Sequence, residues 1–146
     1  MNHPASTAEQ VLAGYQAAVL EQDVDKFMHL YDPEARVFDT WGVWSYENVA
    51  ARRKTIEDWF GSLGTETVKV TFDDVQVTAG PELAVITATG TYTAFSAEGQ
   101  ELRSMQNRFS WAVRRDAAAW KIIHEHTSVP IGDSDLKGIL QRAEAG

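Results

Sequence analysis

Two histidines near the end of the chain have the type and spacing for acid–base chemistry. They lie in the segment Trp120–Ser128, where large apolar residues and histidines occupy every second position. A period of two predicts a β-strand with one face made of Trp120, Ile122, His124 and His126. Imidazole changes its protonation near neutral pH, and apolar neighbours exclude water. The segment therefore predicts part of a small-molecule pocket, with His124 as an acid–base partner and His126 as a ligand-orienting group. The alternative for each is an ordinary structural histidine.

Asp39 is the carboxylate whose surroundings best suit a general base. It lies in the stretch Val37–Trp41, which is mostly apolar and aromatic. Burial among such side chains disfavours the ionised carboxylate and so favours uptake of a proton. The alternative is a strand-end aspartate that hydrogen-bonds the turn before Gly42.

A metal site is another use of the same side chains. Two histidines at positions i and i+2 can form a facial triad with a carboxylate, here Asp39 or Glu125. Strand alternation places Glu125 on the face opposite the histidines, and the chain has no cysteine for a sulfur-based zinc site. We expect no metal and no other bound cofactor.

Composition and charge narrow the class of protein. The 146 residues are 44% hydrophobic and 23% charged, which fits one globular domain over residues 1–146, and no apolar run approaches the roughly 18 residues of a membrane span. The formal net charge of -8 opposes binding to nucleic acid and to anionic lipid. The first residues have neither the basic start nor the apolar block of a secretory signal. We expect a cytoplasmic protein that binds neither nucleic acid nor membranes.

The elements that must position these residues read as helices followed by a sheet. Helical spacing predicts a helix at residues 7–21, a shorter one from Asp23 to Tyr31, and a third from Ser45 or Glu47 to Gly64, with Arg52 on its solvent side. The extended segment Arg36–Tyr46 turns around Trp41 and Gly42.

Four β-branched and aromatic runs follow and predict long strands, at residues 67–78, 83–96, 101–115 and 119–128. Their short connections require antiparallel pairing, because parallel pairs need crossovers of a dozen residues or more. The sequence thus predicts an α+β domain with the helices on one face of a curved meander. Residues 133–144 are expected as a tail or a short helix.

This order of elements resembles the nuclear transport factor 2-like superfamily, and within it the SnoaL-like and ketosteroid-isomerase-like branch. The resemblance covers about residues 8–129, and two motifs carry it: Tyr31–Asp39 after the second helix, and Arg114–Asp116 leading into Trp120–Ser128. It implies a cone-shaped, curved antiparallel sheet with N-terminal helices on its concave face and an apolar pocket at the wide end. It does not imply one reaction, because the fold hosts isomerases, cyclases, dehydratases and association domains.

The resemblance also implies a homodimer formed through the outer face of the sheet. The second and third long strands carry sizeable side chains on both faces, for instance Val85 and Thr91 against Ile86 and Tyr92. A sheet with one face in water should alternate more cleanly.

Individual residues match the family's functional positions. Asp39 matches its aspartate base, and Tyr15 matches a first-helix tyrosine that donates to an oxyanion. Asn107 stands where the family has a second donor, a protonated aspartate; an amide donates at any pH, although the change departs from the steroid isomerase pattern. Tyr15 has the alternative of a core tyrosine. Four aromatic residues are expected at the pocket: Trp41, Trp59, Tyr92 and Phe109.

The resulting hypothesis is an isomerase, cyclase or dehydratase that acts on an apolar polyketide-, terpenoid- or steroid-like substrate. Asp39, assisted by His124, would remove a proton next to a carbonyl group, while Tyr15 and Asn107 stabilise the enolate. The alternative from a different class is a non-catalytic module that holds an apolar ligand or a partner's segment in the same pocket.

Overall fold

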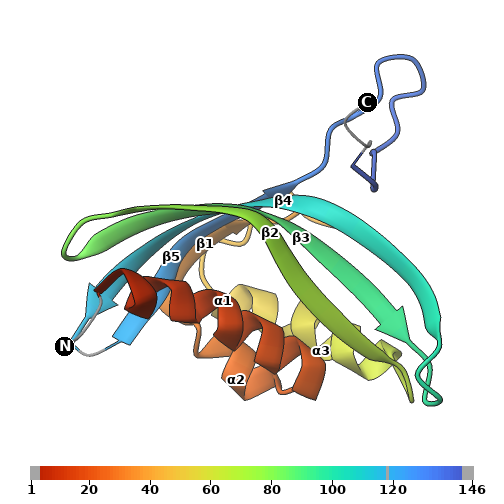
Figure 1. Ribbon diagram of the computed structural model, residues 1–146, viewed down its shortest axis with the longest axis horizontal. Helices are drawn as coiled ribbons and strands as arrows, with labels where there is room; N and C mark the ends of the chain where they lie inside the picture. Colours follow the sequence, from red (N-terminus) through yellow and green to blue (C-terminus); the bar gives the residue numbers. More distant parts are fainter. Residues whose placement is uncertain (1–3, 118, 143–146) are drawn as a thin grey trace.

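A curved five-stranded sheet arches over three helices in the protein (Figure 1). The structure is a computed structural model that describes residues 4–117 and 119–142. Its elements, in chain order, are α1 (Pro4–Glu21), α2 (Val24–Met28), β1 (Tyr31–Phe38), a 3-10 helix η1 (Ala50–Arg52), α3 (Arg53–Ser62), β2 (Thr67–Ala79), β3 (Leu83–Phe95), β4 (Glu101–Asp116) and β5 (Ala119–Ser128). The predicted α+β class is confirmed.

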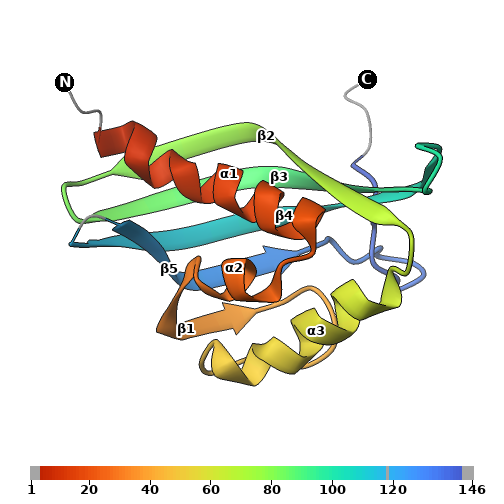
Figure 2. The same cartoon turned by 90° about the horizontal axis from the view of Figure 1, so that it is seen from below.

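The strand order is β1-β5-β4-β3-β2. Strands β2 to β5 form the antiparallel meander that their short connections predict. Strand β1 joins the far edge of β5 and runs parallel to it, so the sheet is mixed. Figure 2 shows α1 lying along the β2 and β3 side of the concave face, with α2 and α3 toward β1.

The core lies between α1 and the concave face of the sheet. Tyr15 and Val19 of α1 are buried against inward residues of the strands, such as Ile86 and Trp111. The ring of Tyr15 lies 5.2 to 5.9 Å from the rings of Phe27, Phe72, Phe109 and Trp111. Aromatic burial of this kind fixes the helix on the sheet and holds the Tyr15 hydroxyl in one place.

Two helices differ in extent from the sequence prediction. Helix α2 ends at Met28 rather than at Tyr31, because the backbone of Ile122 donates to Leu30 and pulls the next residues into β1. Asp32 and Pro33 therefore lie in an edge strand, where a proline can be accommodated. The third helix begins only at Arg53, after η1, and the predicted extended segment beyond Phe38 has a single bridge between Val37 and Tyr46.

A β-bulge in β5 decides which residues face the core. Ala112 pairs with His124 but the next residue, Val113, pairs with Ile122, so Ile123 is an extra residue in β5. One extra residue moves every later side chain to the other face. Glu125 and Thr127 are consequently buried together with Trp120 and Ile122, whereas His126 is exposed. The prediction that His124 and His126 share a face with Trp120 and Ile122 is wrong for this reason.

The tail after β5 covers part of the β4 edge. Strand β5 ends at Ser128 opposite Arg108, so the start of β4 lacks a strand neighbour on that side within the described residues. There the backbone of Gln106 donates to the carbonyl of Leu140 at 2.7 Å. Residues 133–142 form turns and a bridge rather than the alternative short helix; residues 143 and 144 lie outside the described residues. None of the described helices is long and apolar enough to cross a membrane.

Candidate active site

A cavity of about 590 Å³ opens between the concave face of the sheet, α1, α3 and the tail. Its volume falls within the range of small-molecule pockets. Its walls are mostly apolar, and polar side chains reach it from several elements. The lining residues are Tyr15, Asp39, Trp41, Arg52, Thr55, Ile56, Trp59, Ser62, Leu63, Val68, Tyr92, Ala94, Arg103, Ser104, Met105, Asn107 and Leu140.

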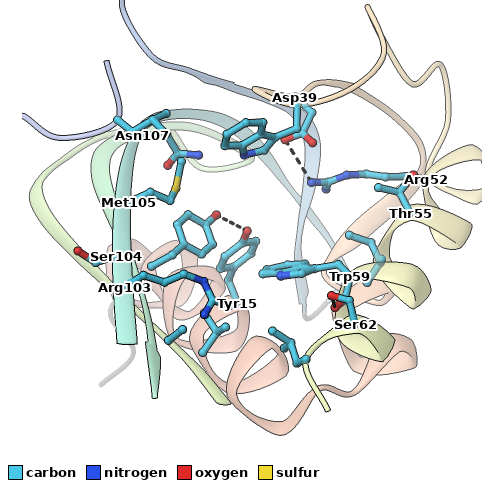
Figure 3. A pocket seen from close by; sticks show the side chains of 17 residues that line it. Tyr15, Asp39, Arg52, Thr55, Trp59, Ser62, Arg103, Ser104, Met105 and Asn107 are labelled. Carbon is cyan, nitrogen blue, oxygen red and sulfur yellow. Dashed lines mark hydrogen bonds and ion pairs between the residues drawn. The ribbon is translucent and has the colours of Figure 1, made fainter. Parts of the chain in front are cut away.

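Asp39 lies just beyond the end of β1, with its carboxylate at the cavity wall (Figure 3). Its side chain is 14% exposed. The hydroxyl of Thr127 donates to Oδ1 at 3.1 Å, and Nη2 of Arg52 lies 3.6 Å from the same oxygen. The predicted apolar surroundings are therefore incomplete, because a cation and a hydroxyl face the carboxylate. Among the described residues, the main contacts of the Asp39 carboxylate are therefore Thr127 and Arg52, and not the backbone of the turn before Gly42.

Tyr15 and Tyr92 form a hydroxyl pair at the cavity wall, with 2.6 Å between their oxygens. One hydroxyl donates to the other, which leaves one O–H proton for a further acceptor. Burial is the largest cause that raises the pKa of Tyr15 well above its usual value, and burial also raises the pKa of Tyr92. Both groups therefore stay protonated and able to donate.

Asn107 brings a second donor to the same cavity (Figure 3). Its side chain is buried, and Oδ1 has no hydrogen-bond partner among the described residues. Gly90 faces it across the β3–β4 ladder and leaves room for the Phe109 ring. Phe109 itself does not line the cavity; it lies in the core behind the tyrosine pair, 5.7 Å from the Tyr15 ring and 6.2 Å from the Tyr92 ring.

Two tryptophans, Trp41 and Trp59, form apolar parts of the cavity wall. Trp59 of α3 packs against Tyr92, with 6.1 Å between the rings, and Trp41 lines the cavity while remaining 55% exposed. A ligand would thus be held between flat aromatic surfaces, with its polar group toward Asp39 and Asn107.

The two histidines lie outside this cavity. Nδ1 of His124 is 2.7 Å from the carbonyl oxygen of Arg36, and its ring meets Phe38 edge to face. His126 lines a separate hollow on the outer side, together with Trp44 and the tail. Asp39 and His124 therefore do not converge, and among the described residues no three His, Asp or Glu side chains are placed to hold a metal ion.

A buried ion pair behind Asp39 was not predicted from the sequence. Arg52, expected on the solvent side, is 5% exposed, and its Nη1 lies 3.2 Å from Oε2 of Glu125, which is fully buried. Glu125 also accepts hydrogen bonds from the Tyr31 hydroxyl and from Nε1 of Trp111. Burial is the largest single effect and would lower the pKa of Arg52, but the charge of Glu125 acts together with Tyr31, Asp39 and Tyr15, and their sum raises the pKa well above its usual value.

The sequence did contain a signal for Arg52 but none for Glu125. Arg52 precedes Ile56 and Phe60 at intervals of four, which places it on the inward stripe of the helix. Glu125 faces inward only because of the bulge at Ile123, and nothing in the local residues requires that bulge.

Comparison with known proteins identifies the family. The sequence model of the SnoaL-like domain family matches residues 8–132 of this chain. A search of curated proteins gives no significant match. Among solved structures, a nuclear transport factor 2-like protein of unknown function from Pseudomonas putida aligns with a TM-score of 0.83 at 20% identity over 96% of each chain.

Two similar structures carry enzyme names. A proposed scytalone dehydratase from Novosphingobium aromaticivorans aligns with a TM-score of 0.73 at 11% identity, over 97% of this chain and 94% of that one. A proposed dehydratase of the nuclear transport factor 2-like family from Streptomyces avermitilis gives 0.72 at 15% identity, over 88% and 96%. Such low identities show the fold and leave the reaction open. Because the family model matches most of this chain, the chain belongs to the SnoaL-like domain family.

Proposed function

We propose that the protein is an enzyme that removes a proton next to a carbonyl group of a neutral, largely apolar small molecule. One observation carries this proposal: Asp39, the Tyr15–Tyr92 pair and Asn107 meet at a single, mostly apolar cavity. A base and two hydrogen-bond donors are the groups that enolate formation requires.

In the proposed first step, a carboxylate oxygen of Asp39 takes a proton from the carbon next to the carbonyl group. The C–H bond breaks, an O–H bond forms on Asp39, and the electron pair moves onto the carbonyl oxygen. The spare hydroxyl proton of the tyrosine pair and the amide of Asn107 donate to that oxygen. Return of the proton at another carbon gives isomerisation, loss of a hydroxide group gives dehydration, and attack on a second carbonyl carbon gives cyclisation.

The charges of the cavity favour a neutral ligand over a carboxylate. Two carboxylates, Asp39 and Glu125, face one guanidinium, that of Arg52. An anionic ligand at this end would meet the carboxylate of Asp39 and a guanidinium whose charge Glu125 already balances, while Arg103, the other cation of the lining, pairs with Glu66. Like charges at short range are unfavourable in a poorly solvated site. The names of the two dehydratase-like structures support the kind of reaction proposed, because dehydration is one outcome of the first step.

The direct test is proton exchange on a simple ketone. β-Tetralone is neutral, bicyclic and small enough for the cavity, and NMR in heavy water follows the replacement of the protons next to its carbonyl by deuterium. The protein should accelerate exchange over buffer, and Asp39→Asn should slow it by roughly 10²- to 10⁴-fold, the usual contribution of a general base. Asp58→Asn is the matched control, because Asp58 is exposed on α3 and pairs with Lys54.

Binding must be measured in parallel, through quenching of tryptophan fluorescence by β-tetralone. Asp39→Asn should bind the ketone about as well as the unchanged protein. Binding without exchange by the unchanged protein would instead identify a non-catalytic ligand-binding module. Full exchange activity in Asp39→Asn would remove Asp39 from the mechanism.

A further inference from the structure

Arg52 lies between two carboxylates that have different environments. Nη1 faces Oε2 of Glu125 at 3.2 Å, and Nη2 faces Oδ1 of Asp39 at 3.6 Å. Glu125 lies in the core, away from the cavity lining, whereas Asp39 reaches the cavity. One cation is thus shared between a carboxylate that a ligand can reach and one that it cannot.

The shared guanidinium is held on the side of Glu125. Oε1 of Glu125 is fixed by hydrogen bonds from Tyr31 and Trp111, and the Tyr31 hydroxyl also accepts from Nη1 of Arg52 at 3.1 Å. All these partners are buried, so contacts within the core, and not contacts in the cavity, fix the position of Arg52. Its contact with Asp39, at 3.6 Å, is longer than its contact with Glu125, at 3.2 Å, and both are ion pairs without a hydrogen bond among the described residues.

This arrangement has a consequence for the base. An arginine in close, bidentate contact would make the carboxylate of Asp39 a poor proton acceptor, because it strongly favours the ionised form. A buried carboxylate with no counter-charge would be costly in the fold. The observed geometry avoids both situations.

We propose that Glu125 is a positioning residue: it holds Arg52 back from Asp39 and so preserves the ability of Asp39 to take a proton from carbon. The inference rests on the function proposed above. Among the described residues, the charged groups close to Asp39 are Arg52 and Glu125. The other groups that face it or share its cavity are neutral, or pair elsewhere: Thr40 and Thr127 beside the carboxylate, Tyr15 and Tyr92, Asn107, and Arg103, which pairs with Glu66 at 2.7 Å. His126 lies in the outer hollow that Asp39 also borders.

The test is the pH midpoint at which Asp39 titrates, read from the carbon-13 NMR signal of its carboxyl carbon and assigned by its loss in Asp39→Asn. In Glu125→Gln the midpoint should move to lower pH for two reasons of the same sign: a negative charge is lost, and Arg52 is freed to approach Asp39. The rate of β-tetralone exchange above the midpoint should fall about tenfold or more, since a weaker base transfers protons more slowly. An unchanged midpoint would overturn the proposal.

A second variant guards against misfolding of Glu125→Gln. Replacing a buried ion pair as a unit is better tolerated than breaking it, so Arg52→Met with Glu125→Gln should fold, and Gln retains the acceptor for Tyr31 and Trp111. Its Asp39 midpoint should lie above that of the unchanged protein, because the nearer charge, that of Arg52, has been removed. A midpoint equal to that of the unchanged protein would show that Arg52 does not act on Asp39.

Two further variants separate charge from structure. Glu125→Asp keeps the charge and should restore a midpoint close to the original, whereas Glu57→Gln, which breaks the exposed pair with Arg53, should change nothing. If the midpoints shift as predicted but the unchanged protein exchanges no protons of β-tetralone, the proposed function is disproved. The effect of Glu125 on Arg52 and Asp39 then still stands. Exchange with an unmoved midpoint in Glu125→Gln would disprove the role of Glu125 alone.

Discussion

The hydroxyl groups of Tyr15 and Tyr92 use one of their two protons for the hydrogen bond between them, and the other proton is free to be donated to a ligand. Either oxygen can be the donor within the pair, so either hydroxyl can present the free proton to a ligand. A single substitution to phenylalanine leaves one hydroxyl, and that hydroxyl still has a proton to donate. In the proposed mechanism, the pair therefore keeps one donor for the oxyanion when either hydroxyl is removed.

We predict strongly non-additive effects for these two tyrosines. Tyr15→Phe and Tyr92→Phe should each slow β-tetralone exchange by less than about tenfold, while the double variant should lose roughly 10²- to 10³-fold, the usual effect of removing an oxyanion donor. Simple multiplication of the two single effects would contradict the shared-proton arrangement.

The same pair predicts the alkaline side of the pH–rate profile. Burial raises the pKa of both tyrosines above their usual value near 10, so the neutral, donating form persists as the pH rises through that value. Exchange, corrected for the hydroxide-catalysed background, should not fall near pH 10. A decline there would show that the donating hydroxyl titrates normally.

At the scale of single residues, the sequence predicted the groups that stand on regular elements. Tyr15 lies on a long helix with a clear inward stripe, and Asn107 begins the part of β4, up to Val113, in which buried residues alternate with more exposed ones. Both reach the cavity. The prediction for His124 was wrong because strand alternation assigns a face by counting residues, and the bulge at Ile123 adds one residue to that count.

Among the elements, the β3–β4 ladder makes room for the Phe109 ring behind the tyrosine pair. Gly90 of β3 faces Asn107 of β4, and a Cβ atom at Gly90 would lie 2.4 Å from the Phe109 ring. That ring is enclosed by Tyr15, Phe72 and Trp111 and has little room to move. The absent side chain is thus what allows Phe109 to sit behind the tyrosine pair.

Gly90→Ala should therefore destabilise the protein by about 1–3 kcal/mol through overpacking, measured by chemical or thermal unfolding. Gly61→Ala is the matched control: Gly61 lies in α3, where an added Cβ meets nothing within 4 Å, and alanine should stabilise the helix by about 0.5–1 kcal/mol. Equal stability of Gly90→Ala and the unchanged protein would show that Phe109 can move aside.

The elements themselves were largely predictable, and their ends were not. Long strands with short connections leave only an antiparallel meander, and the structure has it. The end of α2 was missed because a tertiary contact, from Ile122 to Leu30, competes with helical hydrogen bonding. The parallel pairing of β1 with β5 joins segments some 90 residues apart, which local patterns do not specify.

For the whole molecule, we propose that the outer face of the sheet forms a homodimer. Leu83 and Val85 of β3 are 55% and 50% exposed. Neighbouring apolar side chains of this size on a sheet face favour contact with a partner. Light scattering should give the mass of a dimer, and Val85→Glu should give a monomer. Ala13→Glu, on the exposed side of α1, should leave the mass unchanged; a monomeric unchanged protein would contradict the proposal.

The tail gives the cavity one wall that belongs to neither the sheet nor the helices. Leu140 lines both the cavity and the outer hollow, and its carbonyl is bound to β4 by one backbone hydrogen bond. Part of the cavity lining is therefore encoded in a short terminal stretch of chain, separate from the segments that carry Asp39, Tyr15 and Asn107. Substitutions in that terminal stretch can change the shape of the cavity while the groups of the proposed mechanism and the buried core stay as they are.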